Sequence, residues 1–177
     1  MFDFVSGHSY IVTMQDEIFM EICLAEAREA YAAEEVPVGA LVVAPNGEPI
    51  ARAHNLTVQM SSPVAHAEIL AIMEAAKIVE NFRLVGCTLY VTKEPCIMCA
   101  GAIIESRIKR LVFGCFDQKR GAFGSLLDVN KLPLNHKVDV RGGVLRERSE
   151  DLLQDFFRQR RGTEAVITGP TRNRLIA

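Results

Sequence analysis

Apolar residues recur at helical spacing in four segments of the chain. In the first segment, residues 16–34, they line a stripe that includes Ile18 and Ile22, and Thr13 is the expected N-terminal cap. Ser62 is the expected cap of the second helix. The other three helices are predicted over residues 64–79, 95–105 and 149–161.

Short runs rich in β-branched and aromatic residues lie between these helices and predict strands. The two earliest runs flank Pro45-Asn46-Gly47-Glu48, so they are expected to form a hairpin. Helices then alternate with strands, which is typical of an α/β fold. We therefore expect a three-layer α/β/α sandwich around a mixed sheet of about five strands. The predicted strands cover residues 38–44, 49–54, 88–92, 110–114 and 138–141.

The chain has 177 residues, which predicts a single domain, and we place it at residues 1–161. Residues 115–137 are expected to form a long connection, and connections of that length are usually functional. Residues 162–177 lack a clear apolar period, so they are expected to form a flexible C-terminal tail.

The net charge of −2 hides an uneven distribution. Residues 1–105 carry 5 basic and 14 acidic side chains, whereas residues 106–177 carry 15 basic and 8 acidic side chains. The basic C-terminal third indicates either a polyanionic partner or an ordinary solvated surface.

Membrane and secretory classes do not fit this sequence. No run of about 18 consecutive apolar residues is present, so we expect no membrane-spanning helix. The N-terminus lacks the basic and apolar regions of a signal peptide. Five cysteines are an odd and sparse set, which favours a reducing, cytoplasmic location over a disulfide scaffold.

Two short motifs carry candidate chemistry: His66-Ala67-Glu68 and Pro95-Cys96-Ile97-Met98-Cys99. The Cys-x-x-Cys spacing puts two sulfur atoms within reach of one metal ion, and one imidazole completes a ligand set that suits zinc. Both cysteines fall in the first turn of a predicted helix, where the helix dipole favours the metal-binding thiolate. Zinc in such a site makes water a nucleophile at neutral pH.

Glu68 is the candidate proton carrier, because its carboxylate stands two positions after His66. In a regular helix, residues i and i+2 point to nearly opposite sides. Glu68 can therefore act as the proton carrier beside His66 only if the backbone at the helix start differs from a regular helical turn.

Each motif taken alone also has a structural interpretation. The two cysteines of Cys-x-x-Cys are compatible with a redox pair. They are equally compatible with half of a closed structural zinc site, completed by Cys87 or Cys115. A lone histidine at a helix start is more often a capping or packing residue.

Together and in this order, the two motifs match the signature of the zinc deaminases. The longer pattern closely resembles the bacterial tRNA-specific adenosine deaminases, a branch of the cytidine and deoxycytidylate deaminase superfamily, over residues 15–161. The resemblance implies a cytidine deaminase-like fold. The matching stretches are 35–40, Asn55, 65–69, 81–84, 88–92, 94–102, 106–108, 112–114, 124–126 and 156–158.

The resemblance also assigns roles to individual residues. It implies that His66, Cys96 and Cys99 hold one zinc ion per chain and that Glu68 shuttles protons. Asn55 matches a residue that hydrogen-bonds the target nucleoside. Asp117 and Lys119 match loop positions that approach the flanking nucleotides, so these three are the expected substrate-binding residues.

The family implies hydrolytic deamination of adenosine to inosine at the wobble position of a tRNA anticodon loop, by a homodimer. An anticodon-loop base is already unpaired, so its extrusion costs less than flipping a base from a duplex. Basic side chains of the C-terminal third are available for the phosphates that stay outside the pocket. They include Arg107, Lys119, Arg120, Arg158, Arg160 and Arg161.

Several positions depart from the family pattern. Lys93 stands where relatives usually have leucine, Phe116 where an arginine is more usual, and Phe123 where a small residue is. These departures lie on the expected RNA side and leave the zinc motifs intact. On the C-terminal helix, Phe156 and Phe157 each have an apolar residue four positions earlier, which favours packing over contact with a base.

Two other functions fit parts of the same sequence. A deaminase of free bases or nucleotides, of the guanine or deoxycytidylate type, would use the same zinc motif. A zinc-stabilised RNA-binding module without catalysis would use the metal and the basic residues. A structural zinc site needs no free carboxylate beside the metal, so Glu68 argues against the binding module.

Overall fold

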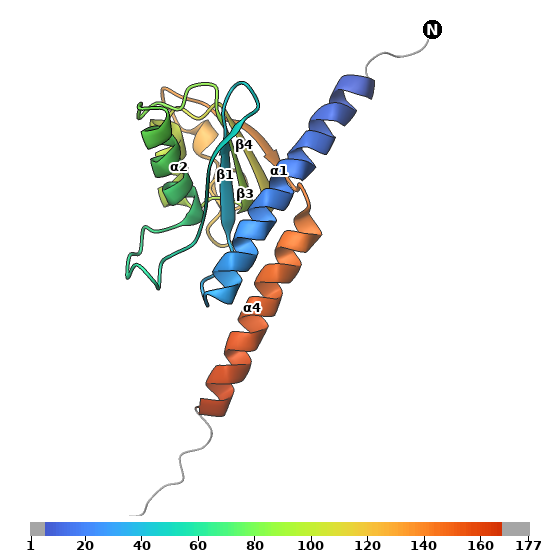
Figure 1. The fold of residues 1–177 in the computed structure, drawn as a ribbon, viewed down its shortest axis with the longest axis vertical. Coiled ribbons are helices and arrows are strands. Elements are labelled where there is room, and N and C mark those ends of the chain that lie inside the picture. Colours follow the sequence, from blue (N-terminus) through green and yellow to red (C-terminus); the bar gives the residue numbers. More distant parts are fainter. Residues whose placement is uncertain (1–5, 168–177) are drawn as a thin grey trace, which may run out of the picture.

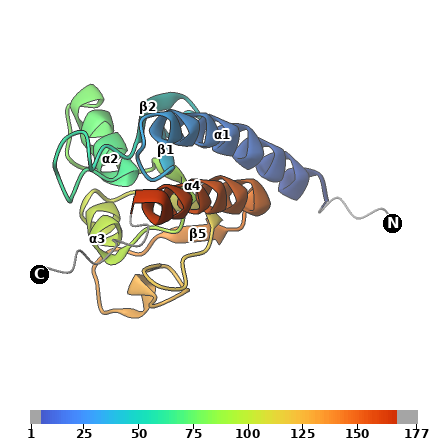
Figure 2. The ribbon, with the colours of Figure 1, turned by 90° about the horizontal axis from the view of Figure 1, so that it is seen from below.

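The computed structural model describes residues 6–167 of the chain. A five-stranded sheet lies between two layers of helices (Figures 1 and 2). The helices are α1 (Ser6–Ala32), α2 (Ala67–Ile78), α3 (Ile97–Glu105) and α4 (Arg146–Ile167), and a 3-10 helix, η1, covers Val129–Lys131. The strands are β1 (Gly39–Val43), β2 (Pro49–His54), β3 (Thr88–Lys93), β4 (Arg110–Cys115) and β5 (Asp139–Gly142).

The strand order in the sheet is β2-β1-β3-β4-β5. β1 is antiparallel to both β2 and β3, whereas β3, β4 and β5 are parallel. Because β1 runs opposite to both of its neighbours, β2 runs in the same direction as β3. The carboxyl ends of β2, β3 and β4 therefore lie at one edge of the sheet. The expected α/β/α sandwich on a mixed sheet is confirmed.

Helices cover both faces of the sheet, with α2 and α3 on one side and α1 and α4 on the other (Figures 1 and 2). Alternate residues of β1 therefore enter different cores. Ala40 and Val42 pack in the cluster that includes α2 and α3, whereas Leu41 packs with Met20 of α1. Every residue of β1 is buried as a result, which explains its continuous apolar run.

The helix boundaries differ from the predicted ones at every end except the C-terminal end of α3. Helix α1 begins at Ser6, so Thr13 lies inside it and the predicted cap was wrong. Figure 1 shows the first turns of α1 extending past the sheet, where no apolar stripe is required. Helix α2 begins after His66 rather than after Ser62, because residues 57–62 form turns, with Ser62 donating its N–H to the Thr57 carbonyl.

The C-terminal helix α4 runs from Arg146 to Ile167, beyond the predicted range of 149–161. The first part of the predicted tail, residues 162–167, is therefore helical, and the rest of it lies outside the described residues. None of the helices in the described part of the chain is both long and apolar enough to cross a membrane.

A buried ionic cluster around Asp16 ties α1 to three strands. Asp16 is 1% exposed and accepts two hydrogen bonds from Arg110 of β4, each 2.8 Å long. The hydroxyl of Tyr90 on β3 donates to it at 2.8 Å, and Arg141 of β5 donates at 2.7 Å. Burial raises the pKa of the Asp16 carboxyl, but these donors together outweigh burial and hold the pKa below its usual value.

This cluster predicts a pH-dependent loss of stability in Asp16→Asn. At pH 7 we expect the free energy of unfolding to fall by about 2 kcal/mol, less than for a fully buried pair because Arg110 and Arg141 retain access to water. A depressed native pKa stabilises the fold above the unfolded value of about 3.9 and stops doing so as the pH falls through the native value. The difference between variant and wild type should therefore shrink below about pH 4.

Urea unfolding followed by circular dichroism measures this difference at several pH values. Asp151→Asn, at an exposed position of α4, is the matched control and should change stability by less than about 0.5 kcal/mol. An Asp16→Asn protein as stable as wild type at pH 7 would show that the cluster does not hold the helix to the sheet.

Candidate active site

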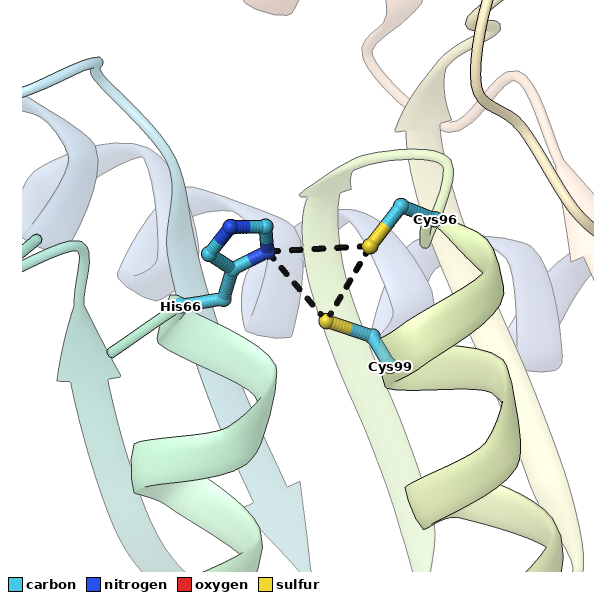
Figure 3. A group of neighbouring side chains, drawn as sticks. All are labelled: His66, Cys96 and Cys99. Carbon is cyan, nitrogen blue, oxygen red and sulfur yellow. Dashed lines mark hydrogen bonds between the residues drawn. The ribbon is translucent and has the colours of Figure 1, made fainter. Parts of the chain in front are cut away.

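Helices α2 and α3 begin side by side at the edge of the sheet where β2 and β3 end (Figure 3). His66 is the N-cap residue of α2 and Cys96 that of α3, and both have extended backbones with ψ of 150° and 173°. Cys99 lies in the first turn of α3. The two motifs, 30 positions apart in the sequence, therefore face each other across the start of two helices.

The distances between the three side chains fit a single tetrahedral zinc ion. The Nδ1 atom of His66 lies 3.7 Å from Cys96 Sγ and 3.4 Å from Cys99 Sγ, and the two sulfur atoms are 3.7 Å apart (Figure 3). A tetrahedral ion with ordinary zinc–ligand bonds requires about 3.8 Å between two sulfurs and about 3.6 Å between sulfur and nitrogen. All three separations agree with these values within a few tenths of an ångström.

The hydrogen bond between the two thiols shifts their pKa values in opposite directions. A hydrogen bond from Cys99 lowers the pKa of Cys96 to about 3, while the same bond raises the pKa of Cys99 above its usual range. The hydrogen bond with Cys96 raises the pKa of His66. The group thus shares protons among three ligand atoms, and a metal ion takes the place of such protons when it binds.

The metal-binding group contains three residues within the described part of the chain: His66, Cys96 and Cys99. Cys87 and Cys115 are buried and free, and neither belongs to this group. A closed zinc site with either of them as the fourth ligand is therefore excluded. Three protein ligands leave one position for water or substrate, as in catalytic zinc sites.

Glu68 lines the same cavity as His66 and Cys96 and is 4% exposed. Its position two residues after His66 is compatible with this arrangement because His66 precedes the helix and has an extended backbone. The i and i+2 geometry of a regular helix therefore does not apply. Burial raises the pKa of the Glu68 carboxyl, which lets it carry a proton at a higher pH than an exposed glutamate.

The cavity has a volume of about 620 Å³ when the open space at its mouth is included. Of the expected substrate-binding residues, Asn55 and Asp117 line it and Lys119 does not. Lys119 is exposed on the loop after β4. The complete lining is Val36, Val38, Asn55, Thr57, His66, Glu68, Lys93, Glu94, Cys96, Asp117 and Arg120.

Asn55 has a structural task in addition to facing the cavity. Its Oδ1 accepts the backbone N–H of Ala67 at 2.9 Å, so it satisfies a free donor at the start of α2. This contact explains how α2 begins after His66, whose own side chain makes no cap bond. The Nδ2 group is then the part of Asn55 that can donate to a substrate.

Lys93 and Asp117 form an ion pair on the cavity wall. Burial raises the pKa of Asp117, but the bond from Lys93 and the backbone N–H groups of Lys119 and Arg120 outweigh it and lower that pKa. The sequence singled out Lys93 only as a departure from the family pattern. Its place beside the predicted Asp117 makes it part of the site.

Two buried glutamates, to which the sequence assigned no role, hold the loops that form the cavity. Glu35 is fully buried and accepts the N–H groups of Val58 and Gln59, each at 2.8 Å, and the hydroxyl of Thr57 at 2.9 Å. Glu94 accepts bonds from the loop after β4 in a similar way. The signal in the sequence that could have indicated these buried roles was an acidic residue next to proline or valine within an apolar run.

The two phenylalanines of α4 differ in their surroundings. Phe156 is 4% exposed and packs edge-on against Tyr31 at 5.6 Å between ring centres, so packing is confirmed for it. Phe157 is 43% exposed, and packing was the wrong prediction there. The i,i+4 spacing to a leucine does not distinguish the two because neighbouring helix positions point about 100° apart.

The sequence matches the family model of the cytidine and deoxycytidylate deaminase zinc-binding region over residues 13–115. It is 48% identical over 148 residues to a tRNA-specific adenosine deaminase of Bacillus subtilis, covering 83% of this chain and 91% of that protein. It is also 48% identical over 152 residues to a tRNA-specific adenosine deaminase of Haemophilus influenzae, covering 85% of this chain and 88% of the relative.

Two solved structures show the same fold. One comes from a study of A-to-I editing by tRNA:A34 deaminases, with a TM-score of 0.73, 43% identity and coverage of 76% of this chain and 98% of that one. The other is a guanine deaminase from Nitrosomonas europaea, with a TM-score of 0.67, 28% identity and coverage of 79% and 83%. The family model, the relatives and the folds agree with the zinc geometry. The chain belongs to the cytidine and deoxycytidylate deaminase superfamily and, within it, to the family of the bacterial tRNA-specific adenosine deaminases.

Proposed function

We propose that this chain is a zinc-dependent hydrolase that converts adenosine to inosine at the wobble position of a tRNA anticodon loop. The main support for this proposal is that the three-residue ligand set lies beside the buried carboxyl of Glu68, which lines the cavity. One zinc ion per chain fits this set. The names of the Bacillus and Haemophilus relatives support tRNA as the substrate.

The residues of the cavity divide the work of the reaction. His66, Cys96 and Cys99 hold the zinc, which when bound supplies activated water. Asn55 hydrogen-bonds the nucleoside and orients it. Glu68 takes up a proton from the attacking water and delivers it to N1 of adenine. It then takes the second proton from the oxygen now bonded to C6 and delivers it to the amino group, so that the C6–N bond breaks, ammonia leaves and the carbonyl of inosine forms.

The alternative substrate class is a free base, and the guanine deaminase among the similar structures favours it. That protein is 28% identical to this chain, whereas the structure from the tRNA:A34 deaminase study is 43% identical. The basic C-terminal third offers contacts for phosphates that a free base does not have. We therefore place tRNA first and test free guanine beside it.

Glu68 is expected to be needed for turnover but not for zinc binding. Wild-type protein should convert the wobble adenosine of a tRNA to inosine, which sequencing reads as guanosine. Glu68→Gln should slow conversion by about a thousandfold or more while keeping about one zinc per chain, because the residue moves protons and does not bind the metal. A strong chelator should abolish wild-type activity, and added zinc should restore it.

Glu74→Gln, on the same helix and exposed, is the matched control and should behave as wild type. Zinc loss from Glu68→Gln would contradict the role of that residue. If the protein converts free guanine and leaves tRNA unchanged, the substrate is a free base and not tRNA.

The C-terminal half of α4 is proposed to contact RNA phosphates. Phe157 and Arg158 line a shallow hollow together with Arg161, and Arg158 is mostly exposed. Arg158→Ala should weaken tRNA binding about threefold to tenfold and reduce the slope of log affinity against log salt by about 1. Fluorescence anisotropy over a salt series measures both.

Arg146→Ala removes another exposed arginine, at the other end of α4, that pairs with Glu150 as Arg158 pairs with Asp155, and it should leave the salt slope unchanged. If Arg158→Ala and wild type show equal slopes of log affinity against log salt, the RNA contact lies outside this hollow.

A homodimer is proposed from apolar side chains exposed in the segments that carry the cavity. Val58 follows Thr57, Val64 precedes His66 by two residues, and Met73 lies on α2, each more than half exposed. A second copy that covers these side chains would approach the mouth of the cavity. Exposed apolar side chains are what the core of an interface buries.

Met73→Glu is therefore expected to shift the protein from dimer to monomer, since a buried charge has no partner there. Sedimentation equilibrium measures the mass. Met14→Glu, at a similarly exposed methionine of α1, is the control and should remain dimeric. A dimer that survives Met73→Glu and dissociates with Met14→Glu would place the interface on α1 instead.

A cytoplasmic location is part of the same proposal. All five cysteines are free thiols, including three outside the proposed metal site. Free thiols persist in a reducing compartment, where tRNA is also found.

A further inference from the structure

The carboxylate of Glu94 is fully engaged by one loop, although no step of the proposed reaction uses it. Glu94 follows β3 and is 2% exposed. The backbone N–H groups of Phe123 and Ser125 donate to Oε1 at 3.0 and 3.1 Å, and that of Asp117 donates to Oε2 at 3.1 Å. The hydroxyl of Ser125 also donates to Oε2.

Four donors thus meet one acceptor group. An ionised carboxylate accepts through about four lone-pair positions and donates nothing, so it matches this set of donors. A glutamine side chain would place an NH₂ group against at least one of these N–H donors. Because the donors are buried or half-buried, the loss of their acceptor leaves them unsatisfied unless the loop moves.

The loop in question, residues 116–127, is also packed tightly against this side chain. A Cβ atom at Gly121 would lie 2.3 Å from Glu94 Oε2 and 2.6 Å from Oε1, so a larger residue does not fit while the carboxylate stays in place. The N–H of Ala122 donates to the carbonyl of Pro95 at 2.9 Å, and Gly121 forms a bridge with Cys96. The loop is therefore joined to the turn that carries a zinc ligand.

The same loop supplies part of the cavity wall, because Asp117 and Arg120 line the cavity. We propose that Glu94 is a positioning residue, which holds loop 116–127 against the Cys96 turn so that Asp117 and Arg120 face the substrate. The effect on tRNA rests on the proposed function. The anchoring of the loop rests on the contacts of Glu94 alone.

Hydrogen–deuterium exchange on the zinc-loaded, substrate-free chain tests the anchoring. In Glu94→Gln, peptides that contain Asp117, Phe123 and Ser125 should exchange at least about tenfold faster than in wild type. Gly121→Ala should give the same result from the loop side, since the added methyl group displaces the carboxylate. Glu105→Gln, at an exposed glutamate of α3, and Gln118→Ala, exposed on the same loop, should exchange as wild type.

Steady-state kinetics with tRNA test the consequence for the substrate. The KM of Glu94→Gln should rise about tenfold, while kcat changes less than about threefold and metal analysis finds about one zinc per chain. A residue needed only for folding would lower zinc content and kcat together. A residue that transfers protons would lower kcat with little effect on KM.

Each result decides between these roles. Wild-type exchange in both Glu94→Gln and Gly121→Ala would overturn the anchoring. Faster loop exchange with an unchanged KM would overturn the substrate-facing part of the proposal. If Glu94→Gln fails to fold, the exchange of the loop in Gly121→Ala and Ser125→Ala is compared with wild type instead. Ser125→Ala is expected to speed exchange less than Gly121→Ala, because the backbone N–H of residue 125 still donates to Glu94. If wild type forms no inosine, the proposed function fails, whereas the exchange measurement still decides the role of Glu94.

Discussion

The antiparallel position of β1 between β2 and β3 is the constraint on which the site depends. Because β1 runs opposite to both neighbours, the chain leaves β2 and β3 at the same edge of the sheet. The parallel pairing of β3 with β4 brings a third segment to that edge. His66, Cys96 and Asp117 follow these three strands in turn, so residues far apart in the sequence share one cavity. This is the edge at which open α/β sheets commonly bind ligands.

Buried carboxylates are the second recurrent feature, and each one joins segments that the sheet alone would leave independent. Asp16 connects α1 to β3, β4 and β5. Glu35 holds the loop before His66, and Glu94 holds the loop that contains Asp117. A charge removed from water requires several donors. Each carboxylate therefore specifies the positions of those donors more strictly than an apolar contact would.

The ion pair of Lys93 and Asp117 lies on the wall of the cavity that His66 and Cys96 also line. Both residues line the wall, and their opposite charges offset each other there.

The sequence by itself determined the element types and the mixed sheet, because the apolar period and the order of the predicted elements can be read along the chain. The ligand triad followed from the two motifs together with the family resemblance, since Cys-x-x-Cys spacing alone left other sites open. It did not locate the start of α2, since Asn55 satisfies that helix from the end of β2, twelve positions earlier. It also missed the roles of Glu35 and Glu94, whose donors lie 22 to 31 positions away. Phe156 and Phe157 looked equivalent until the packing against Tyr31 separated them. Only the tertiary structure decided these points, because burial and hydrogen-bond partners depend on which distant segments meet.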